Sequence, residues 1–368
     1  MKILFISRAF PPITGGIENQ NYALSVWLAK HATIRTIANK RGRFFLPLFA
    51  PYALLIALWN TRSYDVVLLG DGTLGLIGWL LKKATDTPVV SVVHGIDINY
   101  DSKSLGLWYE RVLINIYQRL WIKKFLPSLD GLIAVGNETI RQGVARGIPE
   151  EKFTFIPNGV DTEAHFKTHS RQELGKLLGL SVENTIILLT SGRLAKRKGV
   201  AWFIRNVIQK LPENILYVVA GDGIDRDNIE QAITETDSTH RVKLLGYVSD
   251  EVRDILFNTC DIFIQPNIQV AGDMEGFGIS VIEAASCELP VIVSDLEGLK
   301  DAIHQNENGL LVEPENPEAF RKVITELVSD EEKRHNLGKR ARLYTKAHFE
   351  WSVIAKRYIE ILQSFVKK

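Results

Sequence analysis

Two glutamates in the stretch "EGFGISVIEAASCELPVIVSD" at 275–295 are of a type and spacing that could do chemistry. Glu275 and Glu283 have seven residues between them, and glycines precede the helical run "ISVIEAASCE". Paired carboxylates act as acid and base in glycosidases, at separations of about 5 Å or about 6.5–9.5 Å. They can also accept hydrogen bonds from sugar hydroxyls, or simply stabilise the N-terminus of a helix. The neighbouring motifs indicate which of these uses applies to Glu275 and Glu283.

Two cationic residues in "SGRLAKRKG" at 191–199 are spaced for a diphosphate. The loop follows an apolar, strand-like run, and glycines bracket Arg193 and Lys198. A guanidinium fork and an ammonium point charge together suit a diphosphate. An ordinary solvated basic loop is the alternative. Between the two cations, Lys196 and Arg197 are expected to face solvent.

Two further loops also follow strand-like runs. "SRAFPPITGGIENQ" presents Gly15 and Gly16 ahead of a helix, and glycines let backbone N–H groups approach a phosphate, although a plain turn is the alternative. The loop lacks G-x-G-x-x-G, so it carries no nicotinamide-dinucleotide fingerprint. "VVHGIDI" places His94 where an imidazole could donate to a sugar hydroxyl, although a purely structural histidine is the alternative. Asp97 could orient His94 or face an acceptor.

Short apolar, β-branched runs alternate with helical stretches along the chain, which predicts buried parallel strands in βαβ units. Six runs in each half predict an α/β protein of two doubly wound, Rossmann-like domains. We place the domains at 1–164 and 165–350, with a C-terminal helix at 351–368 that crosses back to the first. Ligands of open parallel sheets bind beyond the carboxyl ends of the strands, where the loops above begin. The runs are "KILFIS", "IRTIA", "DVVLLG", "PVVSVV", "DGLIAV", "FTFIP", "TIILLTS", "ILYVVAG", "RVKLLG", "DIFIQP", "PVIVS" and "GLLVEP".

The composition is that of a soluble globular protein. Of 368 residues, 46% are hydrophobic and 24% charged, and the net charge of +1 argues against nucleic-acid binding through bulk charge. Cys260 and Cys287 stand in apolar sequence and are expected to be reduced packing thiols of a cytosolic protein. No Cys/His cluster has zinc-ligand spacing, and the start "MKILFIS" is typical of a strand rather than of a signal peptide. The apolar window 44–59 is too short to span a membrane and contains two prolines, which predicts a hydrophobic helix at or near a surface.

Taken together, these motifs resemble the retaining glycosyltransferases of family 4. The resemblance is carried by "EGFG" with the two glutamates, "SGRLAKRKG", "TGG" near the start and "PNGVD" at 157–161, and it covers nearly the whole chain. It implies the GT-B architecture of two facing Rossmann-like domains. The chain departs from the family pattern in "SCELP", where Glu288 replaces the usual glycine, and in "AVGNET", where Asn137 replaces a more frequent serine.

The resemblance also implies roles for individual residues. The expected catalytic residues are His94, Glu275, Arg193 and Lys198. Arg193 and Lys198 would hold the donor diphosphate, Glu283 the ribose and Glu275 the transferred sugar. Further donor contacts are expected at Gly15, Gly16, Gly221, Gly223, Tyr247, Val248, Phe277, Gly278 and Ile279. The acceptor-side candidates are Asp97 and Asn137, and no residue is assigned to a metal.

The implied activity is transfer of a hexose from a nucleotide diphosphate sugar with retained anomeric configuration, without a metal or other cofactor. The run "NIQVAGDMEGFG" resembles the phosphatidylinositol mannosyltransferase-like subgroup, which favours GDP-mannose, with a UDP-sugar as the second possible donor. The acceptor would be a glycan or a lipid-linked molecule of cell-envelope polysaccharide or glycolipid biosynthesis. The same residues are also compatible with a nucleotide-sugar epimerase or phosphorylase on this fold, and with a non-catalytic sugar-nucleotide binder.

The expected location is the cytoplasm, with peripheral contact with the inner face of the cytoplasmic membrane as a hypothesis. No nucleic-acid partner is expected. The segment 107–126 mixes aromatic and basic residues, and the window 44–59 is flanked by Lys40, Arg41, Arg43 and Arg62. Such composition suits an amphipathic helix at an anionic membrane surface. Core-packed helices with solvated basic ends are the alternative.

Overall fold

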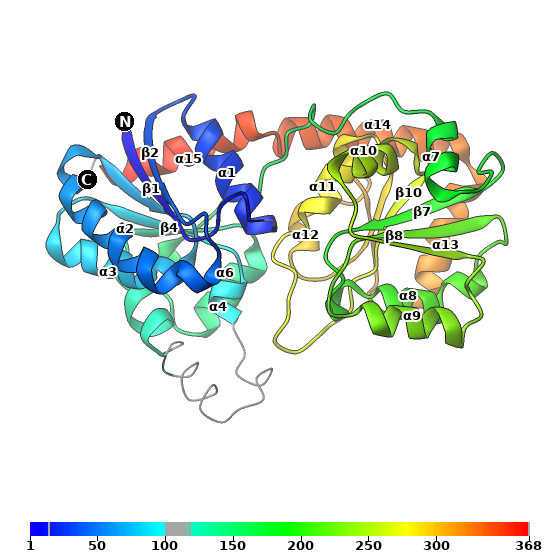
Figure 1. The fold of residues 1–368 in the computed structure, drawn as a ribbon, viewed down its shortest axis with the longest axis horizontal. Helices are drawn as coiled ribbons and strands as arrows, with labels where there is room; N and C mark the ends of the chain where they lie inside the picture. Colours follow the sequence, from blue (N-terminus) through cyan, green and yellow to red (C-terminus); the bar gives the residue numbers. More distant parts are fainter. Residues whose placement is uncertain (14, 100–115, 117–118, 367–368) are drawn as a thin grey trace. The chain divides into compact units, whose positions relative to one another are not determined.

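The computed structural model describes residues 1–13, 15–99, 116 and 119–366 (Figure 1). The chain packs into two compact units, each discontinuous in sequence. The first unit comprises Met1–Gly159, Gly272–Phe277 and Trp351–Lys368, and the second comprises Val160–Ala271 and Gly278–Glu350. The functional division at 164/165 stays a prediction.

The sheet of the first unit has six parallel strands in the order β2-β1-β3-β4-β5-β6. Three of the four inner strands, β3, β4 and β5, are buried along their whole length, because helices cover both faces of a doubly wound sheet. The predicted strands of this half are confirmed. Their bounds are β1 (Lys2–Ser7), β2 (Thr33–Ala38), β3 (Val66–Leu69), β4 (Val89–Val93), β5 (Gly131–Ala134) and β6 (Phe153–Phe155).

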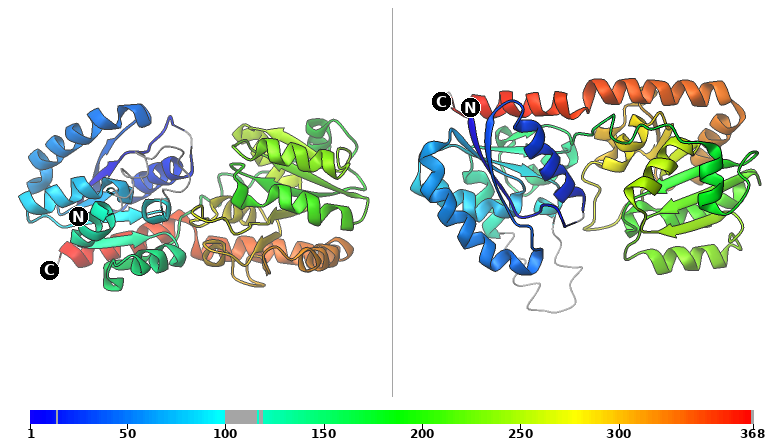
Figure 2. Two further views of the ribbon diagram at one scale, coloured as in Figure 1. Left: turned by 90° about the horizontal axis from the view of Figure 1, so that it is seen from below. Right: turned by 45° about the horizontal axis from the view of Figure 1, so that its top comes forward.

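The helices of the first unit include the last helix of the chain. Figures 1 and 2 show α15 running beside α1, and a Cβ on Gly131 of β5 would collide with the Phe365 ring of α15. The prediction that the C-terminal helix packs on the first domain is therefore confirmed. The bounds are α1 (Gly16–Leu28), α2 (Leu46–Asn60), α3 (Gly75–Ala84), α4 (Ile96–Asn99), α6 (Asn137–Ala145) and α15 (Trp351–Val366).

The sheet of the second unit also has six parallel strands, in the order β12-β11-β10-β7-β8-β9. Counted within the unit, this is the 3-2-1-4-5-6 order of a Rossmann sheet, and the predicted strands are again confirmed. Their bounds are β7 (Ile186–Ser191), β8 (Ile215–Ala220), β9 (Val242–Gly246), β10 (Ile262–Gln265), β11 (Val291–Ser294) and β12 (Leu310–Val312).

Two hydrophobic cores lie on opposite faces of this second sheet. Alternate side chains of β7 divide between them, with Leu188 in one core beside Phe203 and Ile187 in the other beside Phe257. This alternation is what period-2 side-chain geometry requires when helices cover both faces. The helices are α7 (Arg171–Leu178), α8 (Val200–Asn206), α9 (Arg226–Glu235), α10 (Asp250–Thr259), α11 (Ile279–Ser286), α12 (Leu299–Ala302), α13 (Pro317–Ser329) and α14 (Glu331–His348).

Both cysteines are unpaired thiols in the second unit. Burial raises the pKa of the Cys260 thiol, and burial is also the main reason that the pKa of Cys287 is raised to about 12. Both thiols therefore stay protonated and unreactive, as expected of residues that serve packing.

The described helices were compared with the length and hydropathy that a membrane-spanning helix needs. Within the described ranges, no helix is both long and apolar enough to cross a membrane. The prediction of a hydrophobic helix at 44–59 is confirmed, since α2 occupies Leu46–Asn60 and has large apolar side chains at the surface.

Candidate active site

His94 lies directly after β4 in the first unit and is 8% exposed. Its ring atom Nε2 is 3.1 Å from the carbonyl oxygen of Gly70. Because a carbonyl only accepts, Nε2 must carry the hydrogen. In the neutral ring Nδ1 is then the acceptor. With this tautomer a neutral His94 could accept from a sugar hydroxyl at Nδ1 but could not donate to it there, and the sugar contact itself stays a prediction.

Asp97 is buried beside His94 and acts on the backbone rather than on the ring. Its Oδ2 accepts from the backbone N–H groups of His94 and Gly72, each at 3.0 Å. Burial foremost, and Asp71 next, raise the pKa of Asp97, while His94 and Arg8 oppose the shift. Asp97 thus fixes the loop that carries His94.

Arg8 and Asp71, which sequence reasoning missed, complete this polar cluster. Arg8 Nε donates to Asp71 Oδ1 at 2.8 Å, and the same oxygen accepts from the backbone N–H of Thr73 at 3.0 Å. Asp71 is fully buried. An aspartate two residues after β3 ("LLGDG") was the available signal, but its partner lies 63 residues away in the sequence.

The loop that carries Glu275 packs against the loop that carries His94 within the first unit. A Cβ on Gly276 would lie 2.7 Å from the His94 carbonyl oxygen, and one on Gly95 would lie 2.6 Å from Met274 Cε. Glu275 is 7% exposed. The structure therefore brings together two loops that were predicted to be catalytic and that are about half the chain apart.

Phe277, a predicted donor contact, ends the Glu275 loop and is buried. Glu283 belongs to the second unit, so neither unit alone holds both glutamates. Glu275 and Glu283 therefore do not form a carboxylate pair within one unit.

Gly15 and Gly16 lie at the start of α1, as expected. Gly15 precedes the first turn without a side-chain cap, but a Cβ there would collide with the Glu18 carboxylate. A carboxylate thus already lies over this helix N-terminus, where an anionic ligand was expected. The phosphate contact at Gly15 and Gly16 stays a prediction. Asn137 is the exposed first residue of α6, and its acceptor-side role also stays a prediction.

The basic loop of the second unit follows β7. Lys198 is buried at 7% exposure, whereas Arg193 and Lys196 are exposed. Arg197, which was expected to face solvent, is half-buried, and its carbonyl oxygen accepts from Ile268 N–H at 2.9 Å. The loop after β10 therefore holds the backbone of the basic loop.

The loops after β7, β8 and β9 pack backbone to backbone. Gly221 has a φ of +147°, a Cβ on it would collide with the Gly192 carbonyl oxygen, and its N–H donates to Gly246 O at 2.7 Å. Glycine is needed here because it lets the two backbone segments approach closely. A Cβ on Gly223 would likewise collide with Leu194 O. Packing alone therefore accounts for these glycines, and their contact with a donor stays a prediction.

Two predicted neighbours of the nucleotide base follow β9. Tyr247 is 76% exposed, so a planar base could stack on its ring without displacing protein. Val248 is half-buried and packs against the second core of the unit.

Gln265, the last residue of β10, is a buried amide that sequence reasoning missed. Its Oε1 accepts from Ser280 Oγ at 3.1 Å, and a Cβ on Gly278 would lie 3.6 Å from its Nε2. Among the described residues Nε2 has no hydrogen-bond partner. A buried donor is rarely left unsatisfied. This one lies at the start of α11, where Gly278 and Ile279 were predicted to bind the donor. A glutamine ending the apolar run "DIFIQP" was the available signal.

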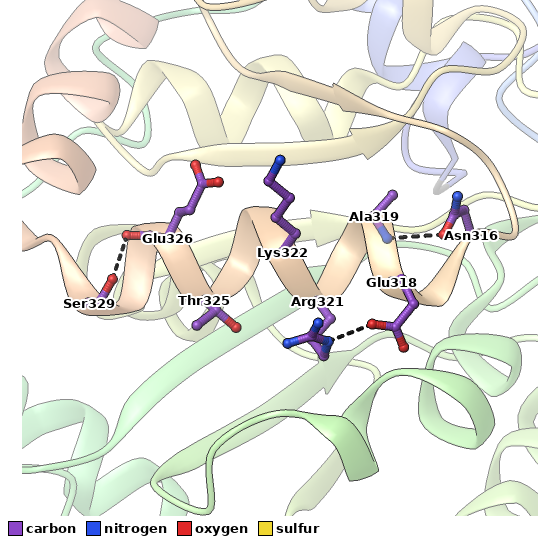
Figure 3. Close-up of a pocket in the computed structure, with 8 residues that line it drawn as sticks. All are labelled: Asn316, Glu318, Ala319, Arg321, Lys322, Thr325, Glu326 and Ser329. Atoms are coloured by element: carbon purple, nitrogen blue, oxygen red, sulfur yellow. Dashed lines mark hydrogen bonds and ion pairs between the residues drawn. The ribbon is translucent and has the colours of Figure 1, made fainter.

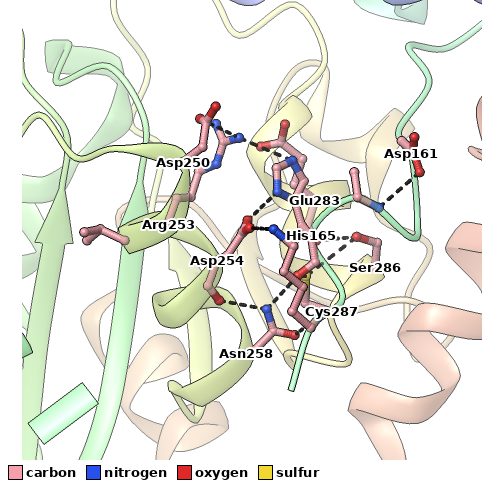
Figure 4. Close-up of polar contacts among 12 residues, drawn as sticks. Asp161, His165, Asp250, Arg253, Asp254, Asn258, Glu283, Ser286 and Cys287 are labelled. Atoms are coloured by element: carbon pink, nitrogen blue, oxygen red, sulfur yellow. Dashed lines mark hydrogen bonds and ion pairs between the residues drawn. The ribbon is translucent and has the colours of Figure 1, made fainter. Parts of the chain in front are cut away.

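Glu283 is half-buried on α11, in a cluster of polar residues that Figure 4 shows. In this cluster His165 Nδ1 is 2.6 Å from Asp254 Oδ1, and Arg253 Nη2 is 3.3 Å from His165 Nε2. An arginine only donates, so Nε2 is the acceptor in this contact and the Nδ1 hydrogen faces Asp254. No sequence pattern signalled this cluster, because His165 stands in the polar segment near the predicted domain boundary.

A hollow of about 540 Å³ lies along α13 and contains none of the predicted site residues. Figure 3 shows side chains that spread outward from this one helix, with Arg321 paired to Glu318 at 2.7 Å. A surface of this kind lacks convergent polar groups, so it is not the candidate site.

Comparison with known families assigns the chain. Residues 14–164 match the family described as Glycosyltransferase Family 4, and residues 179–344 match the family described as Glycosyl transferases group 1. The protein therefore belongs to the family 4 glycosyltransferases and has the GT-B fold, as the motifs predicted.

Characterised relatives differ in their substrates. One is the GDP-mannose-dependent monoacylated alpha-(1-6)-phosphatidylinositol monomannoside mannosyltransferase of Corynebacterium glutamicum, 26% identical over 99% of this chain and 98% of its own. Another is the N,N'-diacetylbacillosaminyl-diphospho-undecaprenol alpha-1,3-N-acetylgalactosaminyltransferase of Campylobacter jejuni, 30% identical over 60% of this chain and 57% of its own. Among solved structures, Anabaena HepE in complex with UDP is similar with a TM-score of 0.76, at 20% identity over 99% of this chain and 100% of that one.

Proposed function

We propose that this glycosyltransferase is a retaining hexosyltransferase that uses a nucleotide diphosphate sugar. The observation that carries the proposal is the packing of the Glu275 loop against the His94 loop. The family resemblance assigns both residues to the transferred sugar, and a shared sugar contact requires their loops to be neighbours. A hydrolytic use of the two glutamates does not account for this arrangement.

The proposed mechanism needs no protein nucleophile. Arg193 and Lys198 bind the diphosphate and stabilise its charge as the bond from the anomeric carbon to the phosphate oxygen breaks. The acceptor hydroxyl oxygen forms the new bond on the same face, and its proton passes to the leaving phosphate. Glu275 accepts hydrogen bonds from the sugar, and Nδ1 of neutral His94 accepts one more. Glu283 accepts from the ribose hydroxyls.

GDP-mannose is the proposed donor, and a UDP-sugar is the alternative. The full-length similarity to the GDP-mannose-dependent enzyme of C. glutamicum supports the first. The similarity of fold to a protein solved with UDP keeps the second open. The sequence run before Glu275 adds to the case for GDP-mannose.

The proposed acceptor is a lipid-linked molecule or a glycan. The names of both relatives include a lipid-linked acceptor, phosphatidylinositol monomannoside in one and a diphospho-undecaprenol in the other. Peripheral binding at the inner face of the cytoplasmic membrane is part of the proposal. Two segments were considered for this. The window 44–59 overlaps α2, whereas residues 107–115 and 117–118 of the segment 107–126 lie outside the described residues.

Thermal stability with nucleotides tests the donor site. GDP, UDP and ADP are each added to the protein, and the nucleotide that binds should stabilise it by about 2.7 kcal/mol at a hundredfold excess over Kd. Lys198→Ala should abolish this shift. Lys196→Ala is the matched control, because Lys196 is an exposed lysine of the same loop.

Three results would argue against the proposal. Absence of a thermal shift with every nucleotide would argue against a donor site. An equal loss of the shift in Lys198→Ala and Lys196→Ala would mean that the loop acts only through its overall positive charge. Turnover of the sugar nucleotide without any acceptor, or only with inorganic phosphate, would favour the epimerase or the phosphorylase instead.

A further inference from the structure

The outer side of α2 is an exposed apolar surface in the first unit. Its inner side packs into the core through Phe49, Ala53 and Ala57. Positions three or four apart share one side of a helix, and the outer positions follow that spacing. We call this surface the α2 face; it consists of Phe44 (87% exposed), Leu48 (65%), Tyr52 (57%), Leu55 (67%) and Trp59 (89%).

Such an apolar face is unusual for a helix that is exposed to water. A surface helix normally turns charged or polar residues outward, and a helix that is apolar all round is normally covered. No charged residue occurs between Leu46 and Asn60. Single exposed apolar residues need no explanation, but a contiguous patch marks a surface that binds something.

Positive charge surrounds the α2 face. From Asn19 to Tyr64 the chain has six Lys or Arg residues and no Asp or Glu, although the whole chain balances 44 against 43. Exposed cations lie at both ends of the helix. Arg35 Nη1 donates to Asn60 Oδ1 at 2.6 Å at one end, and Arg41 lies 5.0 Å from the Phe45 ring at the other.

We propose that the α2 face docks on an anionic lipid bilayer, with α2 lying flat in the interface. The apolar side chains enter the acyl boundary while Arg35, Arg41 and Arg62 meet the headgroups. With fifteen residues α2 is roughly 22 Å long, shorter than the ~30 Å hydrocarbon core, so it lies on the membrane rather than across it. The surrounding cations favour a bilayer over a protein as the partner of the α2 face. A partner protein would need a surface that is both apolar and strongly acidic. The inference deepens the proposed lipid-linked acceptor by naming the surface that reaches it.

Sedimentation with lipid vesicles tests the apolar part of the proposal. The full-length protein should bind vesicles that contain phosphatidylglycerol and not vesicles of phosphatidylcholine alone. The double variant Leu55→Ser with Trp59→Ser should bind at least about tenfold more weakly, because two large apolar side chains no longer enter the bilayer. Leu343→Ser is the matched control, since Leu343 is a leucine of the second unit that is 70% exposed.

Salt and charge variants test the electrostatic part. Binding should weaken as salt is raised, because screening shortens the reach of the headgroup charge. Arg41→Gln with Arg62→Gln should weaken binding to the anionic vesicles by about thirtyfold, on the scale of about 1 kcal/mol for each of the two cations. Lys322→Gln, an exposed cation on α13, should leave it unchanged.

Several outcomes would overturn the docking surface. These are failure of the wild type to sediment with anionic vesicles, unchanged binding in the serine double variant, or self-association in sedimentation velocity that this variant abolishes. The proposed function can fail separately. A normal nucleotide-induced thermal shift in the serine double variant, without lipid, would show that the donor site is intact whatever the vesicles show.

Discussion

Asp97 is the residue whose charge state should matter most for the stability of the first unit. The ordinary pKa of 3.8 is raised in the folded protein, mainly by burial. Between 3.8 and the raised value, the folded chain holds more protons than the unfolded chain. The free energy of unfolding therefore falls as pH rises through this window, and the full cost is reached above the raised pKa.

Asp97→Asn should accordingly raise Tm at pH values above this window, by roughly 2–4 °C for each kcal/mol recovered. The amide oxygen can still accept from His94 and Gly72, while the buried charge and its repulsion from Asp71 are gone. The gain should shrink as pH falls, because the wild-type carboxyl is then protonated as well. Melting curves at several pH values measure this, with the exposed Asp86→Asn as control. A loss of stability that is the same at every pH would contradict the expected titration.

Residue types at strand ends were predictable from the sequence, but their partners were not. His94 and Lys198 stood out because each follows an apolar strand-like run, and Glu275 stood out because of its spacing from Glu283 at the start of a helical run. The bond from Arg8 to Asp71 and the unsatisfied amide of Gln265 depend on which strand ends are neighbours. That information comes from the order of strands in the sheet, which local patterns do not contain.

Among the elements, the turn between β7 and α8 is the one whose shape should control the donor site. Gly199 has a φ of +66°, and a Cβ on it would collide with the Pro266 carbonyl oxygen. Gly179, which ends α7, has a nearly equal φ of +70°, with no described atom within 4 Å of a Cβ. Substitution of Gly179 therefore tests backbone strain alone, whereas substitution of Gly199 tests strain together with a steric collision.

Gly199→Ala should abolish the nucleotide-induced thermal shift as well as lower Tm, because the collision displaces the backbone next to Lys198. Gly179→Ala should cost only about 1–2 kcal/mol for the left-handed conformation and keep the shift. Thermal melts with and without the nucleotide measure both effects. A normal shift in Gly199→Ala would mean that the turn does not position Lys198.

The strands were predictable because their apolar runs are continuous, as burial on both faces requires. The pattern could not show that Glu288, just after α11, adopts a left-handed φ of +61° at the position where the family has glycine. Nor could it show that the loop Gly272–Phe277 packs with the first unit while both flanking segments belong to the second. Loop packing is set by tertiary contacts such as that of Gly276 with His94, which leave no periodic signal.

For the molecule as a whole, each unit has its own cores, so we expect two unfolding transitions. Phe320→Ala in the second unit should lower one transition by the equivalent of about 3–5 kcal/mol, and Leu81→Ala in the first should lower the other by about 2–5 kcal/mol. If a nucleotide binds at Arg193 and Lys198 as proposed, it should raise the transition that Phe320→Ala lowers. Scanning calorimetry measures these shifts. A single transition lowered by both variants would show that the units unfold together.

The place of α15 in the first unit affects how the protein is made on the ribosome. Trp351, Ile354 and Tyr358 are buried against segments that are translated first, and α15 is translated only after the whole second unit. Domains generally fold as units during synthesis. The second unit can therefore complete its fold while the N-terminal half still exposes the apolar surface that α15 covers. The apolar surface of the first unit is thus covered by α15 only at the end of synthesis. Chaperones that shield nascent apolar surface would have the most time to act there.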